Sequence, residues 1–201
     1  MESVWSSEVN FRKRETLNQD IQCDILVIGA GMAGLLTAYM LNKSGRDVVV
    51  IDARSIAGGV TKNTTAKITS QHELIYDKLI KEFGEDGASQ YARANELAIR
   101  RYKEIIDVEK IDCDFEHKDA YLYTSDNIKE IEDEYNAAKR LEIDAEIVDE
   151  VNIPIKAKKA LKFKNQAQFH PLKFLRSISE QLTIYENTVA LDITCLLYTS
   201  L

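Results

Sequence analysis

The sequence is poor in cysteine, carries no excess of basic charge and has no long apolar run, and each absence excludes a class of protein. Three cysteines, Cys23, Cys113 and Cys195, are spaced too widely for a disulfide framework or a Cys-x-x-Cys metal or redox motif. Lys and Arg number 26 against 33 Asp and Glu, and the net charge of −7 argues against nucleic-acid binding. We therefore expect a protein of the reducing cytoplasm, with no metal site and no nucleic-acid partner.

Signals for export and membrane insertion are absent as well. The longest mainly apolar run, 25–41, has 17 residues and contains three glycines, whereas a membrane span needs about 20 apolar residues. Residues 1–20 mix charged and apolar side chains and lack the apolar core of a secretory signal. With 45% hydrophobic and 29% charged residues, the composition is that of a globular protein without a membrane span.

Residues 24–52 have the pattern of a strand–helix–strand unit. The short run 23–28 ends in four apolar residues, 25–28, without alternation, which predicts a buried central strand of a parallel sheet. A helical pattern follows and is closed by Ser44-Gly45, and a second strand, 48–51, ends at Asp52. The 29 residues of this unit match the length of a dinucleotide-binding unit.

A Gly-x-Gly-x-x-Gly motif at 29–34 lies between the first strand and the helix. In this motif Gly29 allows a tight turn, Gly31 lets a pyrophosphate approach the backbone, and Gly34 lets the helix pack on the strand. The helix N-terminus adds free N–H groups and a positive dipole. Asp52, 18 residues beyond Gly34, is placed to accept hydrogen bonds from ribose hydroxyls, and its charge disfavours NADP. These residues predict dinucleotide binding; the alternative is a merely structural glycine turn.

The 20 residues between Asp52 and Glu73 contain no acidic residue and include Gly58-Gly59. In a chain of net negative charge this segment predicts a local anion site along an extended ligand; a solvated polar loop is the alternative. Its cationic and hydroxyl side chains are Arg54, Lys62 and Lys67 together with Ser55, Thr61, Thr64, Thr65, Thr69 and Ser70.

The motifs 28–34, 51–54 and 58–61 resemble those of the D-amino-acid-oxidase-type FAD-dependent oxidoreductases, which include glycine, sarcosine and gamma-glutamylputrescine oxidases. The resemblance runs from about residue 4 to residue 193. Three longer blocks are similar to a bacterial branch of that family in which many members carry a C-terminal Rieske iron–sulfur domain. The blocks are 64–72, 119–124 and 166–173.

This resemblance implies an α/β fold, with a Rossmann-like FAD-binding domain and the first part of an inserted α+β substrate domain. It implies FAD as the cofactor and a Rieske 2Fe-2S cluster in a C-terminal domain beyond this chain. The implied pyrophosphate contacts are Gly29, Gly31, Met32, Ala33 and Gly34. At the adenosine end of FAD, the resemblance implies that Asp52 contacts the ribose and that Ala53, Arg54 and Val189 lie toward the adenine. At the other end, it implies that Thr61, Thr65 and Ala66 lie toward the ribityl chain and flavin.

Lys67 falls where related oxidases place a cation near the isoalloxazine ring, where it would stabilise the reduced flavin; a surface lysine is the alternative. The histidines His72, His117 and His170 show no metal-ligand spacing. His72 could face or covalently link the flavin, or face the substrate, but an ordinary loop histidine fits it better. His170, before Pro171, fits the start of a helix. The pattern names no catalytic residue.

We expect an FAD-binding part at 1–109, the start of a substrate domain at 110–165 and a return to the FAD-binding part at 166–194. The tail 195–201 resembles a translated sequencing adapter, which predicts an N-terminal fragment cut near Thr194; a natural apolar tail is the alternative. The later elements are predicted as helices at 75–83, 91–105, 128–138 and 171–182 and as strands at 121–124, 145–148, 161–163, 183–186 and 189–193.

The predicted function is oxidation of a C–N bond in an amine or amino acid by hydride transfer to flavin N5. Two alternatives stay open: a nucleotide-binding fragment without turnover, and an NAD-dependent dehydrogenase.

Overall fold

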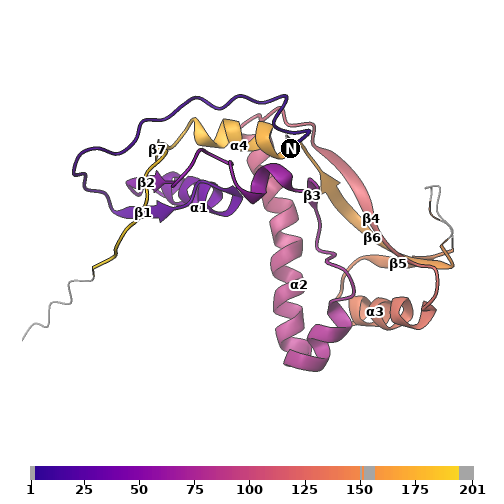
Figure 1. Ribbon diagram of the computed structural model, residues 1–201. Helices are drawn as coiled ribbons and strands as arrows, with labels where there is room; N and C mark the ends of the chain where they lie inside the picture. Colours follow the sequence, from indigo (N-terminus) through magenta and orange to yellow (C-terminus); the bar gives the residue numbers. More distant parts are fainter. Residues whose placement is uncertain (1–2, 150, 152–156, 195–201) are drawn as a thin grey trace, which may run out of the picture. The chain divides into compact units, whose positions relative to one another are not determined.

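The computed structural model describes residues 3–149, 151 and 157–194, so the predicted non-native tail at 195–201 lies outside the described residues. The chain divides into two compact units (Figure 1). Among the described residues, unit 1 comprises 3–65 and 170–194, and unit 2 comprises 66–149, 151 and 157–169. The α/β class is confirmed, since helices alternate with strands along the chain.

Unit 1 is built on a parallel sheet of three described strands in the order β1-β2-β7 (Figure 1). The β-branched residues of β2 are buried on both faces, as parallel strands require. The register aligns Ile25 with Val48 and Val49 with Thr183. The elements of this unit are β1 (Ile25–Ile28), α1 (Met32–Lys43), β2 (Val48–Ile51), the short 3₁₀ helix η1 (Val60–Asn63), α4 (Pro171–Ser179) and β7 (Thr183–Tyr185).

Two strand predictions in unit 1 are wrong. Within the described residues the central strand is β2, and β1 has a single neighbouring strand, so its Leu26 and Ile28 are 48% and 52% exposed. The predicted strand 189–193 is not a strand in the structure, because no strand of the described part pairs with it to complete a ladder. Apolar β-branched residues indicate a strand but do not supply its partner.

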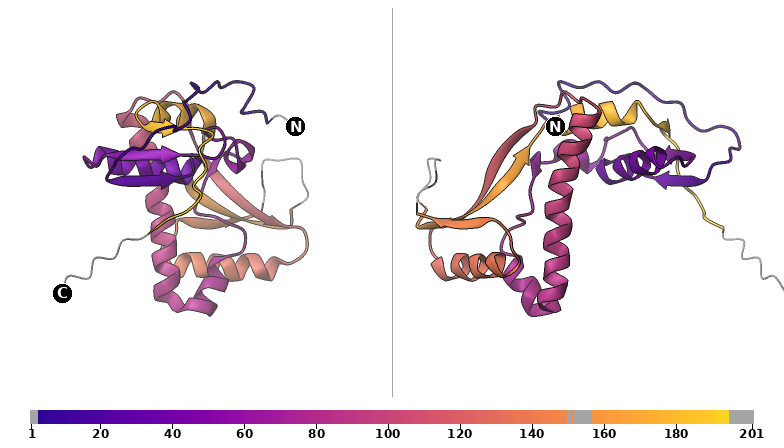
Figure 2. Two further views of the ribbon diagram at one scale, coloured as in Figure 1. Left: turned by 60° about the vertical axis from the view of Figure 1, so that its left-hand side comes forward. Right: turned by 180° about the vertical axis from the view of Figure 1, so that it is seen from behind.

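Unit 2 contains an antiparallel sheet with β6 at its centre, flanked by β4 on one edge and by β3 and β5 on the other. Its helix α2 is interrupted at Gly84, whose φ of 73° and ψ of 173° are not helical, and this confirms the predicted break between two helices (Figure 2). The elements are β3 (Lys67–Ile68), α2 (Tyr76–Val108), β4 (Glu116–Thr124), α3 (Ile128–Arg140), β5 (Ala145–Val148) and β6 (Lys159–Gln168).

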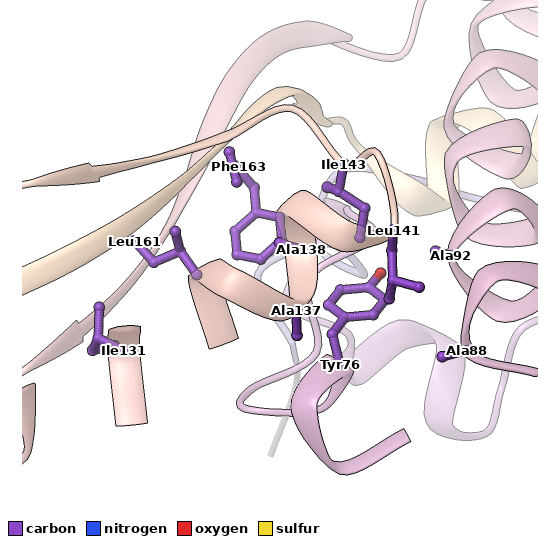
Figure 3. Packing of buried hydrophobic residues seen from close by; sticks show 11 residues of the cluster. Tyr76, Ala88, Ala92, Ile131, Ala137, Ala138, Leu141, Ile143, Leu161 and Phe163 are labelled. Carbon is purple, nitrogen blue, oxygen red and sulfur yellow. The ribbon is translucent and has the colours of Figure 1, made fainter. Parts of the chain in front are cut away.

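The core of unit 2 lies between the sheet and its two helices (Figure 3). Phe163 and Leu161 of β6 are fully buried against Ile131 of α3 and Tyr76 of α2. The alternation of small and large side chains, with Ala88, Ala92, Ala137 and Ala138 on the helices, lets the helices approach the sheet.

Helix α2 groups with unit 2, although the predicted FAD-binding part reached residue 109. The functional division into 1–109, 110–165 and 166–194 stays a prediction. Among the described residues, no helix is both long enough and apolar enough to cross a membrane.

Candidate nucleotide-binding site

The turn between β1 and α1 depends on two glycines. Gly29 has a φ of 108°, which an L side chain rarely adopts, and its N–H donates to the carbonyl of Ile51 at 2.8 Å. A Cβ on Gly34 would lie 1.8 Å from the Gly29 carbonyl oxygen. The predicted tight turn is therefore present. The close approach that Gly34 allows is between α1 and Gly29, the residue that follows the strand β1.

The N-terminus of α1 points its first N–H groups into the space beside this turn. Gly31 precedes the helix and its carbonyl accepts the first helical hydrogen bond, from Leu35, at 3.0 Å. The N–H of Met32 donates to the hydroxyl of Thr61 at 3.2 Å. An α-helix leaves its first N–H groups without an intrahelical acceptor and concentrates a positive partial charge there. This end of α1 has the donors that bind an anionic group.

The carboxylate of Asp52 is held at the end of β2 by two backbone donors. Oδ2 accepts from the N–H of Ala30 at 2.7 Å, and Oδ1 accepts from the N–H of Arg54 at 2.8 Å. Each carboxylate oxygen can accept a further bond, so this orientation leaves lone pairs for a ligand hydroxyl. Asp52 lies beside the glycine turn, at the position predicted for ribose recognition.

The loop after β2 is anchored from two directions. Its Ala57 N–H donates to the carbonyl of Ala30 at 2.9 Å, and its Ile56 N–H donates to Oε1 of Glu186 at 2.7 Å. The second oxygen of Glu186 accepts from the N–H of Arg14 at 3.0 Å. Glu186 is 5% exposed, and backbone donors satisfy its buried charge.

Sequence reasoning missed Glu186 and Arg14, because no spacing connects two residues 172 positions apart. The one signal in the sequence was that Glu186 is the last residue of a predicted strand. Acidic residues at the end of a strand are common on protein surfaces, so this pattern does not indicate a buried carboxylate. The structure shows that this acid fixes the loop that borders the glycine turn.

These groups surround a cavity of about 400 Å³ within unit 1. It is lined by Ile28, Gly29, Ala30, Gly31, Met32, Ala33, Gly34, Asp52, Arg54, Ala57, Gly58, Gly59, Val60 and Thr61. Helix donors at one end, an oriented carboxylate and a Gly31 that carries no Cβ beside Thr61 are the features that fit a dinucleotide pyrophosphate and ribose. The residues present therefore fit the pyrophosphate and ribose of FAD.

The remaining predicted contacts lie outside this lining. Val189 is 58% exposed, one residue beyond Thr188, whose N–H donates to the Asp52 carbonyl at 2.8 Å. Ala53 follows Asp52 outside the lining, and Thr65 is exposed at the end of this part of unit 1. Ala66 and Lys67 belong to unit 2, where Lys67 is exposed on β3.

The histidines are separate from the cavity. Nδ1 of His170 accepts from the N–H of Lys173 at 3.2 Å, which makes it the cap of α4, as the sequence predicted. His72 and His117 lie in unit 2. In the described part of the chain, no three His, Cys, Asp or Glu side chains are grouped as metal ligands.

Comparison with known proteins gives matches over most of the chain. The profile of the DAO family, described as FAD dependent oxidoreductase, matches residues 24–195. YhfW of Bacillus subtilis, named for a Rieske 2Fe-2S iron-sulfur protein, is 42% identical over 96% of this chain and 39% of its own length. Gamma-glutamylputrescine oxidoreductase of Escherichia coli is 32% identical over 50% of this chain and 24% of its own length.

Among solved structures, glycine oxidase of Bacillus cereus superposes with a TM-score of 0.65 at 17% identity, over 87% of this chain and 49% of that protein. This likeness confirms the Rossmann-like fold. The chain spans well under half the length of the two sequence relatives. With a cavity that fits FAD and a family match over most of its residues, the chain belongs to the DAO family of FAD-dependent oxidoreductases.

Proposed function

We propose that the protein containing this chain oxidises the carbon–nitrogen bond of a small amine or amino acid. The observation that supports the proposal is the cavity of unit 1, which the glycine turn, the α1 N-terminus and Asp52 line in a chain of the DAO family. When bound, FAD supplies the two-electron acceptor, N5 of its isoalloxazine ring, for the hydride that leaves the substrate carbon.

Different residues of the chain bind different parts of this cofactor. N–H groups at the start of α1 hold the pyrophosphate, and Thr61 accepts from Met32 while its own hydroxyl proton is free to reach a phosphate oxygen. Asp52 accepts from the adenosine ribose through the lone pairs that Ala30 and Arg54 leave open. The further proposed contacts are Gly29, Gly31, Ala33, Gly34, Ala53, Arg54, Thr65, Ala66, Lys67 and Val189.

The substrate class follows from the relatives. The names of two matched proteins specify gamma-glutamylputrescine and glycine, an amine and an amino acid. The name of YhfW specifies a Rieske 2Fe-2S protein, which supports an iron–sulfur centre as the electron acceptor in a region beyond this chain; oxygen is the other acceptor. The low cysteine content supports a cytoplasmic location.

A visible spectrum tests the proposal. The purified protein is expected to absorb near ~450 nm through bound flavin and to lose that band when an amine or amino acid is added without oxygen. A colourless protein that NAD stabilises would instead indicate a dehydrogenase. If the protein retains flavin but no amine or amino acid bleaches it, the result would indicate a nucleotide-binding protein without turnover.

The variant Gly31→Asp tests the cofactor site itself. The new Cβ would lie 3.3 Å from the Thr61 hydroxyl, and its carboxylate would face the pyrophosphate across the α1 N-terminus. Repulsion between the two anions is expected to abolish flavin retention. Unchanged flavin occupancy in this variant would refute the site, and Gly31→Ala is the control that adds a Cβ without the charge.

A further inference from the structure

Residues 3–20 of unit 1, here called the arm, form no helix or strand and run along α4 and β7 before the chain enters β1 (Figure 1). A terminal segment of this kind is poorly ordered unless other parts of the protein tie it down. The arm is fastened to unit 1 at two places, through hydrogen bonds of residues 14–17 and through the indole of Trp5. Both places lead to the loop 52–64, which borders the nucleotide cavity.

The segment directly after β7, from Glu186 to Thr188, joins the arm to this loop. On its arm side, Oε2 of Glu186 accepts from the N–H of Arg14 at 3.0 Å. The N–H of Glu186 donates to the carbonyl of Glu15 at 3.1 Å. The hydroxyl of Thr188 accepts from the N–H of Leu17 at 3.0 Å. Hydrogen bonds from both ends of the segment therefore fasten the arm along it.

The same segment holds the loop on its other side. Oε1, the second oxygen of its buried carboxylate, accepts from the N–H of Ile56 at 2.7 Å. The N–H of Asn187 donates to the carbonyl of Arg54 at 3.1 Å, and the N–H of Thr188 donates to the carbonyl of Asp52 at 2.8 Å. Since Asp52 and Arg54 line the cavity, the segment connects the arm to the wall of the cofactor site.

The loop depends on such contacts because its backbone is strained beside the cavity. Ala57, which lines the cavity and is 4% exposed, has a φ of 54°. This left-handed conformation is unfavourable for a residue with a Cβ, and it persists only where the surrounding structure holds it. The hydrogen bond between Ile56 and Glu186 lies one residue before Ala57 and is one of the contacts that hold it.

Trp5 fastens the arm to the far end of the same loop. Its indole Nε1 donates to the carbonyl of Thr64 at 2.9 Å, and its ring meets that of His170 edge-on, with 5.0 Å between centroids. Thr64 directly follows η1, whose Thr61 lines the cavity and accepts from the N–H of Met32. The arm thus contacts the loop next to the hydroxyl that lies at the α1 N-terminus.

We propose that the arm positions the loop that borders the cofactor cavity, so that docking of the arm and binding of FAD strengthen one another. An undocked arm leaves Glu186 and Thr188 without their outer partners, and the strained loop can then leave the conformation that places Asp52 beside the glycine turn. FAD requires that conformation and therefore favours the docked arm, and the coupling is equal in both directions. Glu186 and Thr188 are positioning residues, because they act through the loop.

This inference rests on the proposed cofactor site, and it does not depend on which substrate is oxidised. Limited digestion with trypsin measures docking, because Arg12, Lys13 and Arg14 place cleavage points where the arm is fastened. A protease cuts a docked segment only when it opens, so the cleavage rate follows the population of the undocked arm. Saturating FAD is expected to slow this cleavage of the apoprotein about tenfold, a typical coupling between linked sites. Cleavage after Lys43, at the end of α1, is the control for global unfolding and is expected to be much slower.

Thr188→Val tests the coupling from the other side. Valine keeps the shape of the side chain and offers no oxygen to the N–H of Leu17. The arm is expected to be cut faster, and FAD is expected to bind more weakly by up to the factor with which FAD protects the arm. Quenching of flavin fluorescence measures the affinity. Thr188→Ser keeps the hydroxyl and is expected to restore both values.

Ser7→Ala is the matched control within the arm. It removes a hydroxyl that donates to the carbonyl of Val4 at 2.8 Å, away from the segment after β7, and is expected to change neither value. If FAD leaves cleavage of the arm unchanged, or if Thr188→Val binds FAD as tightly as Thr188→Ser, the inference is refuted while the cofactor site stands. Equal cleavage rates at the arm and after Lys43 would also refute it, because the arm would not undock on its own. If the unaltered protein binds no FAD, the proposed cofactor site fails and the inference fails with it.

Discussion

Replacing Gly34 by alanine tests the contact that brings α1 onto the glycine turn. The added Cβ would lie 1.8 Å from the Gly29 carbonyl oxygen, where real contacts are at least 3.0 Å, so helix and turn must separate by at least 1.2 Å. That shift moves the α1 N–H groups away from the cavity and stretches the 3.2 Å contact between Met32 and Thr61. Overpacking of this size costs about 3 kcal/mol.

The expected result is a loss of both stability and cofactor affinity. The free energy of unfolding should fall by about 3 kcal/mol. Affinity for FAD should fall about 100-fold, since about 2.7 kcal/mol of lost binding corresponds to that factor. Urea unfolding of the apoprotein measures the first quantity, and quenching of flavin fluorescence on titration with apoprotein measures the second.

Gly45→Ala is the matched control. Gly45 has a φ of 83°, and no atom lies within 4 Å of the position that a Cβ would take there, so alanine adds backbone strain without a clash at the far end of α1. We expect a destabilisation of about 1 kcal/mol and unchanged flavin affinity. If Gly34→Ala behaves like this control, or like the unaltered protein, the glycine turn is not what positions the cofactor.

Two further predictions concern unit 2. Glu134 is 1% exposed and accepts from three backbone N–H groups at the start of α2, so Glu134→Ala should cost about 3 kcal/mol or more in urea unfolding. Glu134→Gln keeps one acceptor oxygen and should cost less; equal losses would contradict this account. Hydrogen bonds from Lys164 and Lys162 hold the pKa of Glu146 below its ordinary value of 4.5. The resulting stabilisation is present at neutral pH and is lost as the pH falls through that lowered pKa. Glu146→Gln should therefore flatten the acid limb of the urea midpoint measured against pH, and an unchanged limb would contradict the assignment.

Local sequence pattern was sufficient for most elements. The turn at 29–34, the helix end at Ser44-Gly45 and the break at Gly84 were predictable because glycine is required where φ is positive or where backbones come close. Helix α3 and strand β5 followed from their periodicity. These features depend on residues near one another in sequence.

Strand environment was less predictable. The apolar run of β1 suggested a central strand. The number of strands that lie beside β1 depends on which strands pair, and the residues of β1 alone do not determine that pairing. The run 189–193 had strand propensity and no partner in the described sheet. Propensity describes how a residue fits a sheet, whereas pairing is a long-range property.

The sequence by itself determined the family, the nucleotide motif and the acid at the end of the second strand, because the spacing of Gly29, Gly31, Gly34 and Asp52 is a local property of one strand–helix–strand unit. Only the tertiary structure decided how these groups are oriented. Glu186 fixes the loop beside the cavity from 130 residues away, and Glu134 accepts from the N–H of Tyr76 from 58 residues away. Burial and hydrogen-bond geometry join such pairs, and neither is present in the chain until it has folded.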